Sequence, residues 1–151
     1  MRGIGPRRFV RLLTLVLLAV GLARCDDTPT SPTDAPFSVT DLRTGTGSIA
    51  VTGSLVLVDY TGWLYDPSRG DNKGAMFDTS KGGRPFVFTI GAGDVIEGWD
   101  QGVAGMAVGG LRRLVIPPAL AYGDSRNGPI PPYATLVFEI ELVAIGQDVE
   151  E

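Results

Sequence analysis

From Ser38 onward the chain is a series of short β-type runs separated by glycine and proline, and this pattern restricts it to a small sheet-based fold. The runs cover residues 55–60, 86–90, 111–116 and 135–143. In the last run, apolar side chains alternate with Glu139 and Glu141, as expected of a strand with one buried and one solvated face. We therefore interpret the two glutamates as sheet-surface residues and not as a catalytic carboxylate pair.

One segment has helical spacing instead. Val95, Ile96, Trp99 and Val103 would form an apolar stripe along one side of a helix. Asp94 is a plausible N-cap, and a glutamate three residues later completes a capping-box pattern. The residues thus predict an α+β fold, in which an antiparallel sheet of about five strands carries one short helix across its apolar face.

The first 24 residues do not belong to this domain. They hold five arginines and no acidic residue, and an apolar run follows from Leu12 to Ala23. A run of this length suits the central region of an export signal and is too short to span a bilayer as a helix. We expect residues 1–24 to be a signal peptide.

Cys25, the single cysteine of the chain, lies two residues after the end of this run. The stretch Leu22-Ala23-Arg24-Cys25 resembles a bacterial lipobox, in which the cysteine is acylated and serves as the lipid anchor. Arg24 departs from the small residue that this position prefers, so ordinary cleavage after Ala23 stays open as the alternative. The expected location is therefore extracytoplasmic, as a membrane-anchored lipoprotein in the periplasm or on the outer cell surface, with a soluble secreted protein as the alternative.

Residues 25–37 are rich in proline, threonine and aspartate and predict a solvated tether, with the folded domain at 38–146 and an acidic tail at 147–151. Eight of the 13 basic residues and all 17 acidic residues follow residue 24, which gives that part of the chain a net charge near −9. An acidic surface repels phosphate backbones, so we expect no nucleic acid as a partner.

The residue types also exclude several chemistries. The chain has no histidine, and its one cysteine is assigned to the anchor, which excludes Ser-His-Asp and Cys-His catalysis and the usual zinc sites. Gly91-Ala92-Gly93 lacks the third glycine and the βαβ context of a dinucleotide fingerprint. We expect neither a metal nor a cofactor. What remains is a set of aromatic residues drawn from several segments, which composition alone would assign to a core.

Four stretches of sequence indicate what these aromatic residues do. VDYTGWL at 58–64, FDTS at 77–80, PFVFTIGAGDVIEGWDQGVAGMAVG at 85–109 and IPPALAYGDSRNGPIPPYATLVFEIELV at 116–143 closely resemble the FKBP-type peptidyl-prolyl cis/trans isomerase domain, in the same order. The resemblance implies a bent antiparallel sheet wrapped around one short helix. It also implies a pocket for a proline ring between the helix and the sheet.

The resemblance assigns a role to each pocket residue. Trp99 would be the floor; Asp78 and Tyr122 would be the polar rim; and the Ile96 N–H would hold a substrate carbonyl. By this resemblance Asp78, Tyr122, Trp99 and Phe138 are the catalytic residues, and Tyr60, Phe77, Phe86, Val95, Ile96 and Ile130 are the substrate-binding residues. The chain departs from the family pattern by a longer segment between Tyr60 and Phe77 and a shorter one between Tyr122 and Ile130.

The function implied is rotation of X-Pro bonds in extracytoplasmic proteins by non-covalent, apolar sequestration of the prolyl amide. The implied partners are unfolded or partly folded proline-containing proteins and rapamycin-like macrolides. Two alternatives share the fold: a module that binds proline peptides with negligible catalysis, and a chaperone that acts without isomerisation.

Overall fold

The structure is a computed structural model that describes residues 34–146. The expected signal peptide, the anchor Cys25, the tether up to residue 33 and the tail at 147–151 lie outside the described residues. Among the described residues, no helix has the length and apolar character needed to cross a bilayer.

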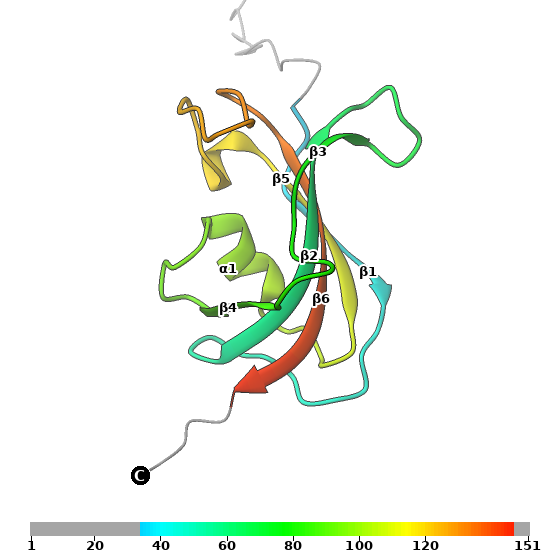
Figure 1. The fold of residues 1–151 in the computed structure, drawn as a ribbon, viewed down its shortest axis with the longest axis vertical. Helices are drawn as coiled ribbons and strands as arrows, with labels where there is room; N and C mark the ends of the chain where they lie inside the picture. Colours follow the sequence, from blue (N-terminus) through cyan, green and yellow to red (C-terminus); the bar gives the residue numbers. More distant parts are fainter. Residues whose placement is uncertain (1–33, 147–151) are drawn as a thin grey trace, which may run out of the picture.

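Six antiparallel strands form one sheet, which confirms the expected α+β fold class. The sheet has one strand more than the approximately five that the sequence predicts. The elements are β1 (Ser38–Arg43), β2 (Leu55–Tyr65), β3 (Lys73–Thr79), β4 (Phe86–Thr89), α1 (Glu97–Val103), β5 (Leu111–Ile116), the 3-10 turn η1 (Pro118–Leu120) and β6 (Leu136–Gly146). The strand order is β1-β5-β6-β2-β3, and β4 pairs with β2. The sheet bends around α1, which lies across one of its faces (Figure 1).

Strand β2 organises the sheet because both of its edges are paired. Residues 55–64 of β2 pair with β6 on one side. On the other side, residues 55–58 pair with β4 and residues 61–65 with β3. One strand therefore holds together the segments that carry Phe77, Phe86 and Phe138.

The helix packs against the sheet at unusually short range. A Cβ at Gly98 would lie 2.5 Å from the Ile116 side chain, and one at Gly102 would lie 2.5 Å from Leu114. The two glycines, four residues apart, thus lie on the face of α1 that contacts β5. They weaken the isolated helix, but they are the reason that its axis can approach the sheet so closely.

Some local expectations were wrong. The helix begins at Glu97 with Ile96 at the N-cap, and no side-chain cap is formed. Asp94 instead accepts a hydrogen bond from the Thr89 N–H at 3.2 Å, so the capping box is absent. The strand expected at 55–60 continues to Tyr65, where β3 pairs with it.

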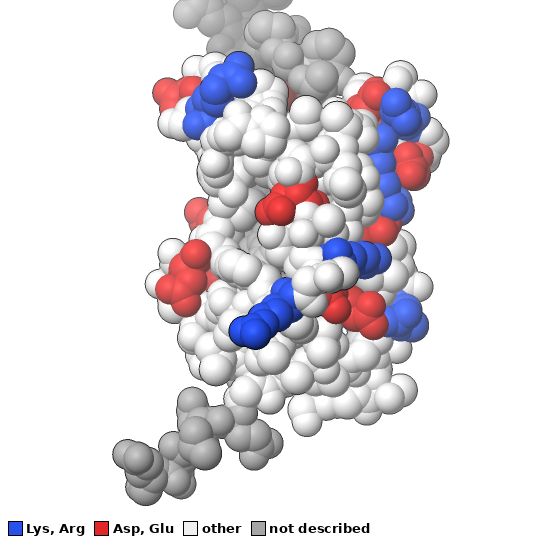
Figure 2. Space-filling model, viewed as in Figure 1, with Lys and Arg blue, Asp and Glu red and all other residues white. Residues whose placement is uncertain are grey.

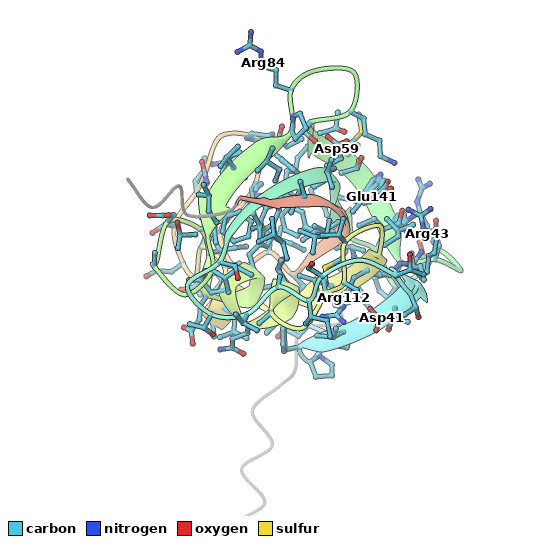
Figure 3. The ribbon with its side chains drawn as sticks, turned by 90° about the horizontal axis from the view of Figure 1, so that it is seen from below. Asp41, Arg43, Asp59, Arg84, Arg112 and Glu141 are labelled. Atoms are coloured by element: carbon cyan, nitrogen blue, oxygen red, sulfur yellow. The ribbon has the colours of Figure 1, made fainter. Side chains whose placement is uncertain are left out.

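The charged residues of β5 do not lie at a sheet edge. That strand is paired with β1 on one side and β6 on the other. The Arg112 guanidinium bonds to Asp41 at 2.6 Å and donates to the carbonyl oxygens of Gly102 and Ala104 at the end of α1. A cation at this end of a helix stabilises its terminal carbonyl groups. Figure 3 shows Arg112 and Asp41 side by side.

Candidate active site

A hollow of about 240 Å³ lies between α1 and the inner face of the sheet. Its lining residues are Tyr60, Phe77, Asp78, Phe86, Asp94, Val95, Ile96, Trp99, Tyr122 and Phe138. They come from β2, β3, β4, β6, the segment through the start of α1 and the loop after η1. Nine of the ten residues predicted for the site are therefore brought together.

Ile130 is the exception. Its side chain is only 4% exposed and packs in the hydrophobic core instead of lining the hollow. Asn127 and Ile130 exchange two backbone hydrogen bonds, which close a tight turn and direct this residue inward. Ile130 therefore lies in the core and outside the lining of the hollow, and its role as a pocket wall stays a prediction.

Trp99 forms the floor, and three rings stand edge-on to it. The ring centroids of Tyr60, Phe138 and Phe86 lie 5.0, 5.2 and 5.9 Å from that of Trp99, at interplanar angles of 79°, 88° and 90°. Edge-to-face contacts place the positive edge of one ring against the negative face of another and are more favourable than face-to-face stacking. The arrangement produces a rigid, largely apolar cage.

Gly62 makes one wall of this cage possible. Phe77 and Phe138 meet edge to face, with centroids 5.5 Å apart. A Cβ on Gly62 would lie 2.7 Å from both rings, closer than carbon atoms can pack. Nothing in the local sequence around Gly62 reveals that two distant rings pass over it.

The polar rim begins with a short hydrogen bond. The Tyr60 hydroxyl donates to Asp78 Oδ2 at 2.6 Å, and the Thr79 N–H donates to Asp78 Oδ1 at 2.8 Å. Burial, followed by the hydrogen bond to Asp78 and its charge, raises the pKa of Tyr60 well above its usual value. The Tyr60 hydroxyl therefore remains a donor throughout the physiological pH range.

Two N–H groups at the floor are unpaired. The Ile96 backbone N–H makes none of the hydrogen bonds found within residues 34–146, although the Ile96 carbonyl accepts from Trp99 and Asp100. The buried Trp99 Nε1 also has no partner within the described residues. The role of the Ile96 N–H as a donor to a bound carbonyl group stays a prediction.

The segment before α1 is fixed by carboxylates. Asp100 accepts from the N–H groups of Gly91 and Gly93 at 2.8 and 3.2 Å, and Asp94 accepts from Thr89. Asp94 also lines the hollow, although the sequence analysis had assigned it to helix capping. No three metal-binding side chains come together anywhere in residues 34–146.

Fold and site together define a small α+β domain whose pocket is built to take up an apolar ring. Residues 47–143 match the family model of the FKBP-type peptidyl-prolyl cis-trans isomerases, and the chain belongs to this family. The resemblance found in the sequence is confirmed.

Two relatives and one solved structure show the extent of the match. The chain is 45% identical over 109 residues to the FK506-binding protein of Neisseria meningitidis serogroup B, covering 71% of this chain and 94% of that protein. It is 47% identical over 119 residues to FK506-binding protein 4 of Neurospora crassa, covering 78% of this chain but only 24% of that longer protein. The crystal structure of AtFKBP13 superposes with a TM-score of 0.63 at 39% identity, covering 73% of this chain and 93% of that one.

Proposed function

We propose that this protein is a peptidyl-prolyl cis/trans isomerase that binds a proline ring in the cage above Trp99. The observation that carries the proposal is the set of three rings standing edge-on to a buried indole in a hollow of about 240 Å³. Family membership supports the same reaction. A flat, apolar ring fits such a cage better than a charged or extended side chain.

The chemistry needs no proton transfer. Resonance gives the peptide C–N bond double-bond character and a rotation barrier of about 18–20 kcal/mol. Resonance separates charge, which water favours and an aromatic cage does not. Transfer of the prolyl amide into the cage therefore weakens the planar form relative to the twisted one. Tighter binding of the twisted geometry supplies the remaining acceleration.

The polar groups of the pocket orient the bound segment. The Ile96 N–H donates to a substrate carbonyl, which fixes the peptide relative to the floor. Tyr122 and Asp78 lie on the lining and provide the polar rim. Neither group exchanges a proton, so Tyr122 acts by its position and Asp78 by its position and charge.

A direct measurement tests this proposal. The full chain, purified in mild detergent, is added to an Ala-Leu-Pro-Phe peptide, and the cis-to-trans rate is followed by protease-coupled absorbance. We expect the protein to accelerate isomerisation, with a rate that saturates as the peptide concentration rises. FK506, the ligand in the names of the relatives, should abolish this acceleration when it is equimolar with the protein. Peptide binding without acceleration would instead indicate a binding module or a chaperone, and the enzymatic proposal would be wrong.

We propose as clients unfolded or partly folded proteins with exposed X-Pro bonds, and rapamycin-like macrolides as competing ligands. The cage is open to solvent at Asp78, Asp94 and Phe86, which are exposed. A chain segment can therefore cross the pocket mouth while its proline ring enters the cage.

We further propose that the protein is a lipoprotein anchored through Cys25 outside the cytoplasm. The proposal rests on the basic and apolar pattern of residues 1–24 and on the position of the cysteine directly after it. Cys25→Ser should move the protein from the membrane fraction to the soluble extracytoplasmic fraction without changing its thermal unfolding. A wild-type protein that already fractionates as soluble would favour cleavage after Ala23.

A further inference from the structure

The pocket carries negative charge that no cation in its lining compensates. Asp78 and Asp94 are two of the ten lining residues, and the lining includes no lysine or arginine. The donors to their carboxylates are the Tyr60 hydroxyl and the backbone N–H groups of Thr79 and Thr89. Because these donors are neutral, they orient the carboxylates without cancelling their charge.

The two carboxylates lie at the mouth of the pocket and not at its floor. Trp99 and Phe138 are each only 4% exposed, whereas Asp78 and Asp94 are both exposed to solvent. A proline ring resting on Trp99 therefore places the residues beside it in the chain at the level of Asp78 and Asp94.

Ion pairing in the described part of the chain occurs elsewhere. The pairs are Arg43–Glu141, Arg69–Asp66, Lys73–Glu139, Arg112–Asp41 and Arg113–Glu139. Two of them join neighbouring strands, two join strands that have one strand between them, and the Arg69–Asp66 pair lies within the turn after β2. None includes a carboxylate of the pocket. Figure 3 shows two of these pairs, Arg43 with Glu141 and Arg112 with Asp41.

The cations without an ion pair in the described residues are not among the residues that line the pocket. Lys81, Arg84 and Arg126 are exposed, on the segments that follow β3 and η1. Arg84 projects away from the body of the molecule (Figure 3). In Figure 2 the surface over α1, at the left of the view, carries acidic side chains. Glu97 and Asp100 in the first turn of α1 extend the negative charge beyond Asp94.

From this arrangement we propose that the pocket selects prolines flanked by lysine or arginine and disfavours prolines flanked by aspartate or glutamate. The inference rests on the proposed function and names its substrate class. Charges at a pocket mouth beside aromatic walls interact more strongly than charges in open water, but salt still screens them. We expect a difference of about two- to fivefold in kcat/KM for each charge change, at low ionic strength.

The test compares peptides that differ in one residue beside the proline. One series places lysine, glutamine or glutamate before the proline, and a second series places them after it. For the full chain at low salt, kcat/KM should fall in the order lysine, glutamine, glutamate in at least one series, and 0.5 M NaCl should compress the range. Equal values for the three peptides in both series would overturn the inference while leaving the proposed function intact.

Two charge-neutralising variants separate the pocket from the general charge of the protein. Asp94→Asn should reduce the lysine-to-glutamate ratio of kcat/KM by about threefold or more. Asp71→Asn is the matched control, because Asp71 is exposed in the turn between β2 and β3. Its side chain accepts a hydrogen bond from the Lys73 N–H, which an amide oxygen can also accept. If both variants reduce the ratio equally, the selection comes from net charge and the inference is wrong.

A binding measurement keeps the two proposals distinguishable. Peptide affinities are taken from NMR shift titrations of the same protein. One outcome is that the protein accelerates the isomerisation of no peptide over the uncatalysed rate but binds lysine peptides more tightly than glutamate peptides. In that case the enzymatic proposal fails and the charge selection stands. If neither rates nor affinities depend on the flanking charge, the selection fails.

Discussion

Phe138 occupies the centre of the proposed site because its ring contacts aromatic residues from three other elements. Its centroid lies 5.2 Å from Trp99, 5.5 Å from Phe77 and 6.3 Å from Tyr60. The ring is almost fully buried, and Gly62 leaves the space in which it lies. The shape of the cage thus depends on large side chains that cannot be shortened without loss of packing.

Shape should therefore matter more to catalysis than any one polar group. We expect Phe138→Ala and Trp99→Ala to lower kcat/KM severely, and each to reduce the free energy of unfolding by about 3–5 kcal/mol. Activities are compared at equal folded fraction, measured by circular dichroism. Tyr122→Phe, which removes only a hydroxyl, should lose less than about tenfold, because one hydrogen bond contributes about 0.5–1.5 kcal/mol. Complete inactivity of a folded Tyr122→Phe protein would contradict a mechanism based on sequestration.

At the scale of elements, the turn between β2 and β3 is less independent of the fold than its polar composition indicates. The ladder continues through Tyr65 and Lys73, and the Asp66 N–H bonds to the Asn72 carbonyl. The Lys73 ammonium lies 2.6 Å from Glu139 and 4.4 Å from the centroid of the Trp63 ring. Residues 67–71 lie outside the strand pairing, and the hydrogen bonds of Ser68, Arg69 and Asp71 are made within the turn, to Asp66, Asn72 and Lys73.

Changes within residues 67–71 and a change at Lys73 should therefore affect the free energy of unfolding differently. Replacement of residues 67–71 by a two-residue Asn-Gly turn should leave the free energy of unfolding within about 1 kcal/mol, the scale of surface changes. Lys73→Ala should lower it by about 1–2 kcal/mol, since the partly buried Glu139 loses a charged partner. Urea unfolding measures both. A large loss in the shortened turn, or none in Lys73→Ala, would contradict this division.

Glu139 joins three strands through its contacts with Lys73 and Arg113. Burial alone would raise its pKa, but the hydrogen bonds and charges of Lys73 and Arg113 outweigh burial and lower the pKa below 4.5. A carboxylate with a lowered folded-state pKa contributes stability above its unfolded-state value, and this contribution is lost as the pH falls through the folded-state value.

The wild-type protein should consequently lose more stability between about pH 5 and 3 than Glu139→Gln does. Two other carboxyl groups have a lowered pKa: Asp41, chiefly through its hydrogen bond from Arg112, and Asp66, chiefly through its hydrogen bonds from Ser68. Both titrate in the wild-type protein and in the variant, so their contributions to stability cancel in the comparison. Urea unfolding at each pH gives the difference. Parallel stability curves for the two proteins would show that the Glu139 contacts contribute nothing.

How far the sequence predicts the structure differs between elements for physical reasons. Strand β6 alternates cleanly and was predicted almost to its ends, because one of its faces is buried along most of its length. Strand β1 is exposed at every residue and β3 at most, so neither carries an apolar pattern that could reveal it. The start of α1 was misplaced because Asp94 bonds to Thr89, a tertiary contact that local capping rules do not include.

The pocket was predictable only through family resemblance. Its six aromatic residues come from six separate segments, and composition cannot distinguish a cage from a core. Ile130 shows the limit of that transfer: it follows a segment that departs from the family length, and it lies in the core. Asp94 lines the pocket, although its local sequence pattern had suggested helix capping and the family resemblance had assigned it no role.

At the scale of the whole molecule, the bent sheet separates two kinds of polar structure. Glu139 and Glu141, which alternate with the buried face of β6, form ion pairs across strands. The opposite face meets α1 and the pocket, whose polar lining residues are Tyr60, Asp78, Asp94 and Tyr122. The ion pairs of Glu139 and Glu141 and the polar lining of the pocket are therefore on different faces of the sheet.

This separation leads to a prediction for the pH dependence of catalysis. The chain has no histidine, and the pKa of Tyr60 is raised by burial and then by its bond to Asp78, so Tyr60 stays protonated and continues to donate that bond. No lining group is required to exchange a proton. The value of kcat/KM should therefore be nearly constant from about pH 6 to 9. Isomerisation of a neutral peptide is followed by NMR exchange, with unfolding monitored at each pH as the control. A bell-shaped profile in the folded protein would require an essential acid and base, and the sequestration mechanism would then be wrong.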